Sequence, residues 1–427
     1  MKEKGVLLPI FSLPSKYGIG DFGYEAYEFI DILSKNNIEY WEILPINDSH
    51  RLPYSPISYY ALDIDYISLD KLKDMNLIKS PATKEKSSRI VYDKFKTKYY
   101  KEAYNNFVET EDYGKFKENK KIIQYAEYMS STTGEPKEYY IFLQYILDKQ
   151  WEELKKYANS KNVKIIGDMP IYPAFNSCEV KYNSECFELE NGKMVYMAGT
   201  PADYFNEDGQ KWGNPIYNFE KIKEYQYMYL LDRYKEYLRR FDIIRIDHFR
   251  AYDSFFRIPI NGTAKNGYYT DGPSYGFFDE LFKFTTPDRF IIEDLGEIRE
   301  ETIKLRDYYN FTRLKIFQYT INLENLTDFD SDVENIVIYP GNHDCHTILG
   351  WYKSLKFKEK VKLRRFLNKQ KCNFLNINRG IIEYCLKSKA RIAIIAAQDI
   401  LNLDDSARIN LPRKLRNRKL VLGNVRF

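Results

Sequence analysis

The sequence lacks the features of membrane, secreted and nucleotide-binding proteins. No stretch approaches the roughly 20 apolar residues of a membrane span. The apolar run near the N-terminus is broken by Pro9 and is too short for the core of a signal peptide. The five cysteines are odd in number and form no C-x-x-C pair, which argues against a disulfide framework and for a reducing compartment. No G-x-G-x-x-G or Walker A motif is present. We therefore expect a cytoplasmic protein that needs no cofactor.

The chain also lacks a strong charge of one sign. Its 65 Lys and Arg and 61 Asp and Glu residues are spread along the whole length and leave a formal net charge of +4. No basic stripe marks a nucleic-acid face, so we expect no nucleic-acid partner. With 427 residues, 44% of them hydrophobic, the chain is long enough to bury a large core.

Short apolar runs bounded by turn residues recur along the chain. Such runs, when helical stretches separate them, are typical of buried parallel strands. The eight candidate strands are 5–10, 40–46, 163–171, 242–249, 289–296, 314–320, 335–344 and 391–399. Eight strands alternating with helices predict an α/β fold, the (β/α)8 or TIM barrel, whose active site lies at the carboxyl ends of the strands.

We predict one catalytic barrel domain over residues 1–427, with two insertions. The gap between the second and third strands is too long for one barrel helix, and its apolar residues recur three and four apart around 92–107 and 139–147. This pattern predicts a mainly helical inserted subdomain at 71–160. The interval 172–240 contains a stretch dense in Gly, Pro, Asn and aromatics, which predicts a loop-rich insertion over the barrel mouth.

Acidic residues follow the apolar strands. Asp247 and Glu293 end two neighbouring candidate strands, and glycosidic-bond chemistry needs two such carboxyls, one to attack the sugar carbon and one to transfer a proton. Arg245 points to the same side as Asp247 and should keep it ionised, whereas nearby like charge should raise the pKa of Glu293. Asp344 and Asp168 end two further strands. Such acids also cap helices or pair with a barrel arginine, and Asp168 fits a structural salt bridge as well as a substrate contact.

Histidine is scarce, and its placement is therefore informative. Three of the four histidines, His248, His343 and His346, lie beside the acids Asp247 and Asp344. A neutral imidazole at a barrel mouth can donate to sugar hydroxyls and stabilise charge on the ring. The rival interpretation is a metal site formed by His343, His346 and Asp344, but no H-x-E or H-E-x-x-H spacing accompanies these residues, so we expect no metal.

Aromatic side chains occur in the segments expected at the barrel mouth. Trp212 and Tyr204 lie in the Gly/Asn/Pro-rich stretch, and Tyr54 follows the second strand. Their flat rings can stack on pyranose faces. Ordinary loop packing is the alternative for each of them.

Together these motifs resemble the 4-α-glucanotransferase family, also called amylomaltase or disproportionating enzyme, within the α-amylase-like barrels. The resemblance spans nearly the whole chain. The matching segments are SLPSKYGIGDFG (12–23), WEILPIN (41–47), GDMPIY (167–172), PADYFNEDGQKWGNPIY (201–217), RIDHFRAY (245–252), EDLGEI (293–298), GNHDCHTILGWY (341–352) and AQDIL (397–401).

The resemblance implies a retaining mechanism on malto-oligosaccharide donors and acceptors. Asp247 would be the nucleophile that forms a covalent glycosyl-enzyme, Glu293 the general acid/base, and Asp344 the third acid that holds the donor sugar. The two working carboxyls would then lie about 5–5.5 Å apart. The remaining sugar contacts implied by the resemblance come from Arg245, His248, His343, Asp168, Trp212 and Tyr54.

Two stretches depart from the family pattern. Residues 342–346 keep the His-Asp pair but change its neighbours, and the C-terminal stretch lacks a tryptophan that the family carries. Asn410 aligns with a family asparagine and is expected to contact substrate. An α-1,4-glucan hydrolase of the same fold shares the intermediate and stays open as an alternative. An inactive glucan-binding homologue is disfavoured because Asp247 and Glu293 are both present.

Overall fold

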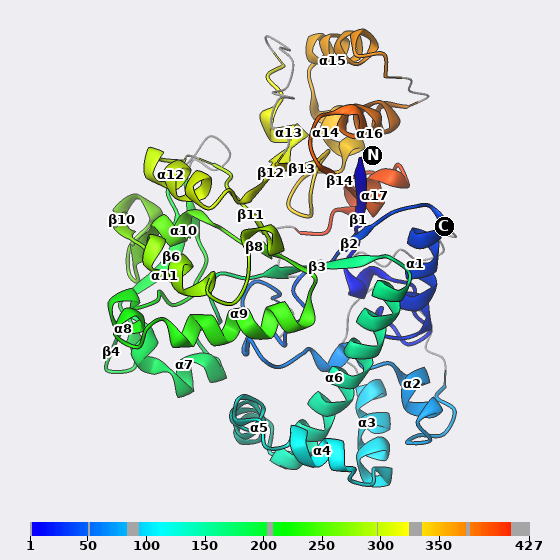
Figure 1. The fold of residues 1–427 in the computed structure, drawn as a ribbon, viewed down its shortest axis with the longest axis vertical. Helices are drawn as coiled ribbons and strands as arrows, with labels where there is room; N and C mark the ends of the chain where they lie inside the picture. The colour runs from blue at the N-terminus through cyan, green and yellow to red at the C-terminus, as the bar shows by residue number, and fades with distance from the viewer. Residues whose placement is uncertain are drawn as a thin grey trace.

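Eight parallel strands close into a barrel at the centre of the molecule (Figure 1). In order around the barrel they are β1 (Glu3–Leu7), β14 (Ile392–Ala396), β13 (Ile336–Tyr339), β12 (Thr312–Ile316), β11 (Phe290–Ile292), β8 (Ile243–Ile246), β3 (Lys164–Met169) and β2 (Tyr40–Glu42). Each predicted strand contains or overlaps one of them, so the (β/α)8 barrel is confirmed. The predicted strand 314–320 is displaced, because the chain turns into the short helix α13 (Phe317–Thr320) at its end.

The barrel is described in a computed structural model, which covers residues 2–49, 52–82, 94–202, 208–296, 298–323, 335–372 and 376–410. Every residue of β8, β13 and β14 is buried, as expected for parallel strands that are covered on both faces. The barrel closes where β1 pairs with β14, from Glu3 opposite Ile392 to Leu7 opposite Ala396.

Helices cover the outside of the barrel between the strands. Those that precede a barrel strand are α1 (Tyr24–Lys35), α6 (Lys137–Ser160), α9 (Met228–Arg240), α11 (Ser274–Leu281), α12 (Glu300–Tyr308) and α16 (Ile377–Lys387). Helices α1 and α16, for example, bury apolar residues on one side, which is the amphipathic pattern of a surface helix; these residues are Phe29, Ile30 and Leu33 in α1 and Ile377, Ile381 and Cys385 in α16.

Between β2 and β3 the chain forms a group of helices at the lower end of the view (Figure 1). They are α2 (Leu69–Asp74), α3 (Lys94–Asn106), α4 (Glu111–Phe116), α5 (Lys120–Thr133) and α6. Aromatic rings fill the space between them. The ring centroid of Phe107, for example, lies 5.0 Å from that of Tyr113, edge-on, and 5.0 Å from that of Phe142, tilted. Aromatic pairs prefer such arrangements.

The interval 172–240, expected to be rich in loops, contains several regular elements. They are α7 (Cys178–Tyr182), β4 (Leu189–Glu190), β5 (Lys193–Met194), β6 (Tyr196–Thr200), β7 (Gln210–Lys211), α8 (Phe219–Glu224) and α9. Strand β6 pairs with β7 and with β9 (Ser254–Pro259), which in turn pairs with β10 (Tyr268–Asp271), so this interval contributes to a separate antiparallel sheet. The local composition did not indicate that this stretch pairs with β9, a strand that is distant in the sequence.

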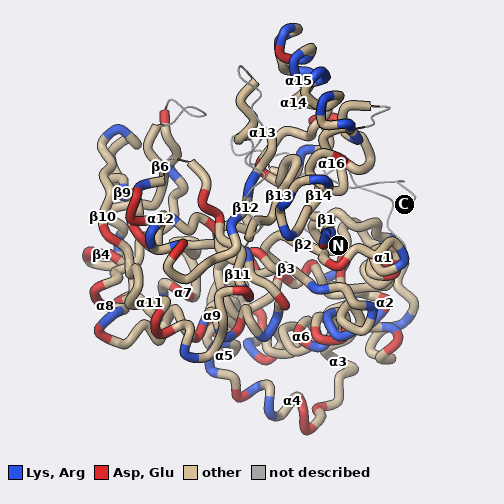
Figure 2. The backbone as a smooth tube through the Cα atoms, turned by 45° about the horizontal axis from the view of Figure 1, so that its top comes forward, with Lys and Arg blue, Asp and Glu red and all other residues tan. Residues whose placement is uncertain are grey.

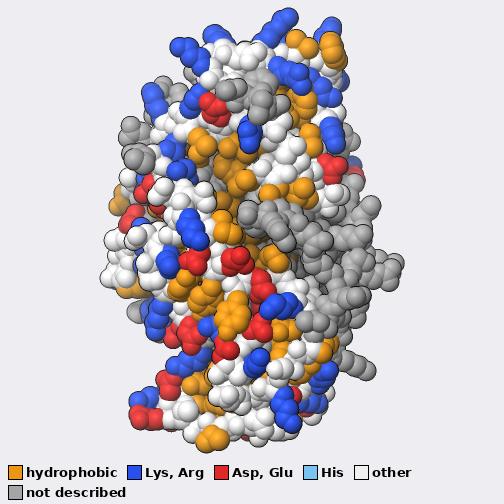
Figure 3. Space-filling view, turned by 90° about the vertical axis from the view of Figure 1, so that its right-hand side faces the viewer, with side chains coloured by type: hydrophobic (Ala, Val, Ile, Leu, Met, Phe, Trp, Pro, Cys, Tyr) orange, Lys and Arg blue, Asp and Glu red, His pale blue; other side chains and the backbone are white. Residues whose placement is uncertain are grey.

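The helices after β13 form a second apolar cluster at one end of the molecule. This region comprises α14 (Ile348–Ser354), α15 (Phe357–Lys369) and α16, and its core includes Ile338, Leu363 and Ile381. Figure 2 shows acidic and basic residues interspersed over most of the chain, whereas α15 is mainly basic. Figure 3 shows lysine and arginine side chains gathered at this end.

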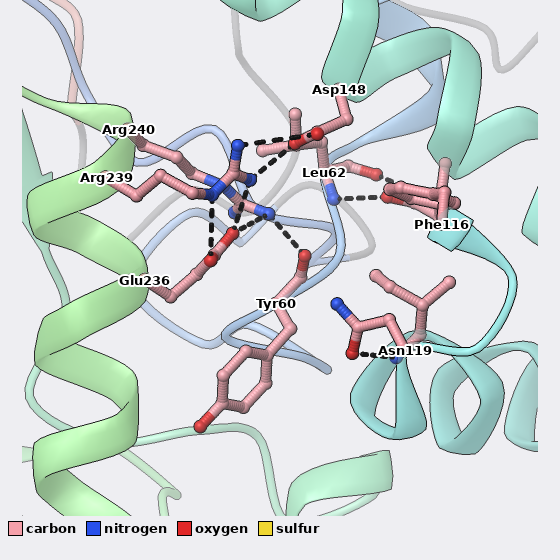
Figure 4. Close-up of a pocket in the computed structure, with 10 residues that line it drawn as sticks. Tyr60, Leu62, Phe116, Asn119, Asp148, Glu236, Arg239 and Arg240 are labelled. Atoms are coloured by element: carbon pink, nitrogen blue, oxygen red, sulfur yellow. Dashed lines mark hydrogen bonds and ion pairs between the residues drawn. The ribbon is translucent and has the colours of Figure 1, made fainter. Parts of the chain in front are cut away.

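A charged crevice lies where α9 meets the helices between β2 and β3 (Figure 4). Arg239 contacts Glu152 at 2.9 Å and also pairs with Asp148, both from α6. Arg240 binds Glu236 at 2.7 Å and donates to the carbonyl of Tyr60. These contacts join α6 to the barrel helix α9.

Two further properties bear on the sequence expectations. Among the residues that the structure describes, no helix is long and apolar enough to cross a membrane. The five cysteines are buried as free thiols.

Candidate active site

Arg245 stands at the centre of the acids at the barrel mouth. Its Nη1 lies 2.6 Å from Oδ1 of Asp168 and 3.4 Å from Oδ1 of Asp247, and its Nη2 lies 3.0 Å from Oε2 of Glu293. The pairing of β3 with β8 places Asp168 opposite Arg245, which explains their contact. Arg245 is 1% exposed, so these charges attract one another with little screening by water.

Asp247 and Glu293 follow the paired strands β8 and β11, and both carboxyls contact the guanidinium of Arg245. Two carboxyls brought to one guanidinium from neighbouring strands are the groups that a retaining glycosidase mechanism uses. Burial, and then the like charge of Glu293, raise the pKa of Asp247 well above its ordinary value. Burial acts in the same direction on Glu293, but Arg245 and a backbone N–H outweigh it and lower the pKa of Glu293.

The expected order of the two pKa values is therefore corrected. We expected Arg245 to single out Asp247, but the guanidinium lies closer to Glu293. The backbone N–H of His248 also donates to Oε2 of Glu293, at 2.9 Å. The pKa of Asp247 is accordingly raised and that of Glu293 lowered, which is the reverse of the expected order. The alternation of side chains along β8 predicts the side of the strand on which Arg245 lies. It does not predict the distance from Arg245 to an acid that follows the neighbouring strand.

His248 connects the acid pair to an aromatic ring. Its φ of +48° is the left-handed conformation, in which its N–H reaches Glu293. The ring of Trp212 meets the imidazole edge-on at 4.9 Å. Burial lowers the pKa of His248 to about 4, so the ring is neutral at pH 7 and can donate to a hydroxyl group.

Asp168 is wholly buried, and both of its oxygens are occupied. Oδ1 pairs with Arg245, and Oδ2 accepts a hydrogen bond of 2.6 Å from the hydroxyl of Tyr54. The same hydroxyl lies 2.5 Å from Nε2 of His343, whose ring stacks on Tyr54 with the centroids 5.5 Å apart. For Asp168 this geometry favours the structural salt bridge over the direct sugar contact. Tyr54, expected as a stacking platform, holds Asp168 and His343 together.

Asp344 is held on both carboxylate oxygens. Nε2 of His343 lies 3.1 Å from Oδ2, and the side-chain amide of Asn410 donates to Oδ1 at 2.6 Å. Burial would raise the pKa of Asp344, but His343 and Asn410 outweigh it and hold the pKa well below its ordinary value. In return, Asp344 overcomes the effect of burial on His343 and raises the pKa of the imidazole. Asp344 is thus an ionised carboxylate at neutral pH.

Beneath these groups lies an acid that the sequence analysis did not single out. Glu42 on β2 is 1% exposed and accepts a hydrogen bond of 2.8 Å from the hydroxyl of Tyr339 on β13. Burial raises the pKa of Glu42 to about 7, against the opposing effect of Arg245. The sequence does contain a signal for Glu42, because it is an acid inside the apolar run YWEILPI. An acid in a buried strand needs a polar partner inside the barrel.

The structure brings most of the candidate residues together through direct contacts. The connected set contains Tyr54, Asp168, Arg245, Asp247, Glu293, His343, Asp344 and Asn410. His248 joins it through Glu293, and Trp212 through His248. Tyr204 lies outside the described residues. His346 binds Asp405 instead, and within the described ranges no group of three or more His, Cys, Asp or Glu residues is arranged to hold a metal ion.

This arrangement has the chemical parts for transfer of a glycosyl group. Asp247 and Glu293 follow neighbouring strands and both contact Arg245, so they can supply a nucleophile and a proton donor. A third carboxylate, Asp344, is ionised and can accept hydrogen bonds from sugar hydroxyls. A neutral histidine and a tryptophan ring, His248 and Trp212, stand beside the acid pair.

Comparison with known proteins gives a consistent result. The family profile described as 4-alpha-glucanotransferase matches residues 8–138 and 129–420. The chain is 32% identical to the 4-alpha-glucanotransferase of Aquifex aeolicus, over 96% of this chain and 93% of that one. It is 33% identical to the 4-alpha-glucanotransferase of Clostridium butyricum, over 95% and 93%.

A solved structure agrees with the sequence comparisons. The amylomaltase from Streptococcus agalactiae in complex with acarbose superimposes with a TM-score of 0.90 at 28% identity. The similarity covers 99% of this chain and 97% of that one. With an eight-stranded barrel, a cluster of acids at its mouth and full-length similarity, this chain belongs to the 4-alpha-glucanotransferase family.

Proposed function

We propose that this enzyme transfers α-1,4-glucan segments from one malto-oligosaccharide to another through a covalent glycosyl-enzyme on Asp247. The observation that carries the proposal is the placement of Asp247 and Glu293 at the ends of neighbouring barrel strands, each in contact with Arg245. The family supplies the substrate class, and the site supplies the two groups that a retaining mechanism requires.

In the first step the carboxylate of Asp247 attacks the anomeric carbon while the bond to the leaving 4-oxygen breaks. Glu293 donates its proton to that oxygen. This step requires the proton on Glu293 and the negative charge on Asp247, the reverse of the pKa order described above, so the bound sugar has to favour transfer of the proton from Asp247 to Glu293. Arg245 contacts both acids and stabilises the anionic form of either.

In the second step Glu293 removes the proton from the 4-hydroxyl of an acceptor sugar. The acceptor oxygen attacks the anomeric carbon and releases Asp247, so two inversions retain the α configuration. We assign to Asp344 the binding of the donor sugar's hydroxyls, because its carboxylate is ionised and partly exposed. Trp212 and His248 contact sugar on the other side of the acid pair.

We also propose an organisation and a location for the protein. The barrel with its helices forms one catalytic domain, 1–427, in which 71–160 is a helical subdomain and 172–240 extends over the mouth. Five free thiols fit a reducing compartment, the cytoplasm. Maltodextrins or glycogen would be the source of the glucan.

The experiment is incubation of the purified enzyme with maltotriose. Transfer produces a ladder of longer and shorter oligosaccharides, because each covalent intermediate is captured by another sugar. Asp247→Asn should abolish the ladder while binding of maltotriose, measured by calorimetry, persists. Products no longer than the substrate would establish the hydrolase instead, and an unchanged ladder from Asp247→Asn would refute the assignment of the nucleophile.

A further inference from the structure

A segment that follows the last barrel strand returns to the mouth and contacts Asp344. It runs from 404 to 410 and includes the short 3-10 turn η6 (Asp405–Ala407). Nη2 of Arg408 donates to the carbonyl oxygen of Asp344 at 2.7 Å, and the side chain of Asn410 donates to Oδ1 at 2.6 Å. The backbone N–H of Asn410 binds the carbonyl of His343 at 3.1 Å. This segment therefore fixes the position of both the peptide group and the carboxylate of Asp344.

The segment is itself fixed by Asp405. Oδ1 of Asp405 accepts the backbone N–H of Thr347 at 3.0 Å, and Oδ2 lies 2.6 Å from Nδ1 of His346. Nη1 of Arg408 lies 3.3 Å from Nε2 of the same imidazole. An imidazole with a hydrogen on Nδ1 and a lone pair on Nε2 satisfies both contacts, because it donates to Asp405 and accepts from Arg408. His346 thereby links Asp405 to Arg408.

Asp405 occupies a fitted position on helix α14. A Cβ added to Gly350 would lie 2.0 Å from Oδ1 and 2.2 Å from Cγ of Asp405. The turn beneath is fixed independently, because the backbone N–H of Ile348 binds the buried Asp399 at 2.7 Å. Only a glycine at position 350 leaves room for the carboxylate, and the carboxylate cannot move along the helix without losing Thr347 and His346.

We infer that Asp405, His346 and Arg408 are positioning residues, which hold Asp344 in the orientation that the donor sugar needs. This inference rests on the function proposed for Asp344. The chain of contacts runs from α14 through Asp405 and His346 to Arg408, and from Arg408 to the Asp344 peptide. None of the three is wholly buried, and none has to touch the sugar. They act by restricting the rotation of a carboxylate that is itself 36% exposed.

A double-mutant cycle of Asp405→Ala and Gly350→Ala tests the inference, with kcat and KM measured for maltotriose transfer. We expect Asp405→Ala to lower kcat about 10- to 100-fold with a smaller change in KM, since a displacement of ~1 Å in a catalytic group has such effects. Gly350→Ala should lower kcat similarly, because the new methyl group displaces Asp405, although alanine favours the helix. The double variant should be no slower than Asp405→Ala, since no carboxylate remains to be displaced.

A neighbour in the same turn provides the matched control. Asp404 caps Ser406 and lies 3.7 Å from Lys353 at the surface, but no contact joins it to Asp344. Asp404→Ala should keep the wild-type kcat. A purely structural role for Asp405 would predict lower thermal stability of Asp405→Ala and of Gly350→Ala, with kcat per folded molecule unchanged in each.

Asp344→Asn separates the possible failures. If it is inactive while Asp405→Ala keeps full kcat, the inference is overturned and the function of Asp344 stands. If Asp344→Asn is fully active, both are overturned. Should Asp405→Ala not fold, Arg408→Gln replaces it, because this change leaves the contacts between Asp405 and α14 in place; an unchanged kcat in that variant also overturns the inference.

Discussion

The barrel mouth and the helices between β2 and β3 are stabilised by opposite means. At the mouth, acids from three strand ends share one guanidinium, Arg245. Between the helices, aromatic rings pack against one another, and most of the ion pairs are exposed, such as Lys115 with Glu111; the buried pair of Lys96 with Asp21 is an exception. We therefore expect the charged groups at the mouth to contribute mainly to catalysis. The buried apolar side chains of the helical region should contribute mainly to the stability of the fold. Substitutions in the two regions should separate activity from stability.

The largest effect on activity is expected from Glu293→Gln. Glutamine keeps the shape and can still accept the N–H of His248, but it cannot donate or remove a proton. Loss of general acid–base catalysis should reduce kcat by about 10²- to 10⁴-fold. The thermal midpoint should fall little or rise, because one carboxylate leaves a crowded site. Initial rates of ladder formation and a melting curve measure both; a large loss of stability without loss of kcat would contradict the division between the regions.

Trp151→Ala should produce the converse result. The ring is buried in α6, 5.2 Å from Phe22 and 5.6 Å from Phe241, and its Nε1 donates to the carbonyl of Arg240 at 3.2 Å. Removing a buried tryptophan typically costs about 3–5 kcal/mol of unfolding free energy. Urea unfolding measures this loss, and kcat of the folded fraction should stay at the wild-type value.

Glu42→Gln should change the pH dependence of stability. Burial raises the pKa of Glu42 to about 7 in the folded protein, above its ordinary value of 4.5. The unfolded chain therefore ionises first as the pH rises, so the stability present below pH 4.5 declines until about pH 7. Glutamine can still accept from Tyr339 but has no charge.

Compared with the wild type, the Glu42→Gln variant should gain stability between pH 4.5 and pH 8. The upper limit of the gain is about 3 kcal/mol, from 1.36 kcal/mol for each unit of pKa. Melting curves of both proteins across this range provide the measurement. Parallel curves for the two proteins would show that Glu42 does not titrate there.

The smallest effect is expected from Lys115→Gln in the helical region. Its pair with Glu111 spans one helical turn, and both side chains are largely exposed. Such pairs contribute less than about 0.5 kcal/mol, and salt screens them. Unfolding at low and high ionic strength should give nearly equal values for variant and wild type. A loss comparable to that of Trp151→Ala would mean that surface charge, not ring packing, maintains these helices.

The barrel was predictable from the sequence because its signal is local. An apolar strand such as 242–249 can be predicted from consecutive residues. Eight such strands that alternate with helices are compatible with few folds. The interval 172–240 was less predictable, because strand β6 is defined by hydrogen bonds to β9 rather than by its own composition. Likewise, the end of strand β12 is set by the turn into α13 rather than by apolar character.

The site was predictable in membership but not in its internal contacts. Asp247, Glu293 and Asp344 were found because they end strands, and strand ends meet at one rim. The closer approach of Arg245 to Glu293 depends on distances across two strands. The contact of Arg408 with Asp344 joins residues 64 positions apart, and no local pattern reports such a contact.

The closure of the barrel by β1 and β14, followed by the 404–410 segment, has a consequence for biosynthesis. A ribosome releases β1 long before β14, its neighbour in the closed barrel, and before the residues that hold Asp344. Until these later residues emerge, the partial chain has acids on its early strands but no closed barrel around them. We expect the nascent chain to be inert toward glucan until β14 and the 404–410 segment have left the ribosome.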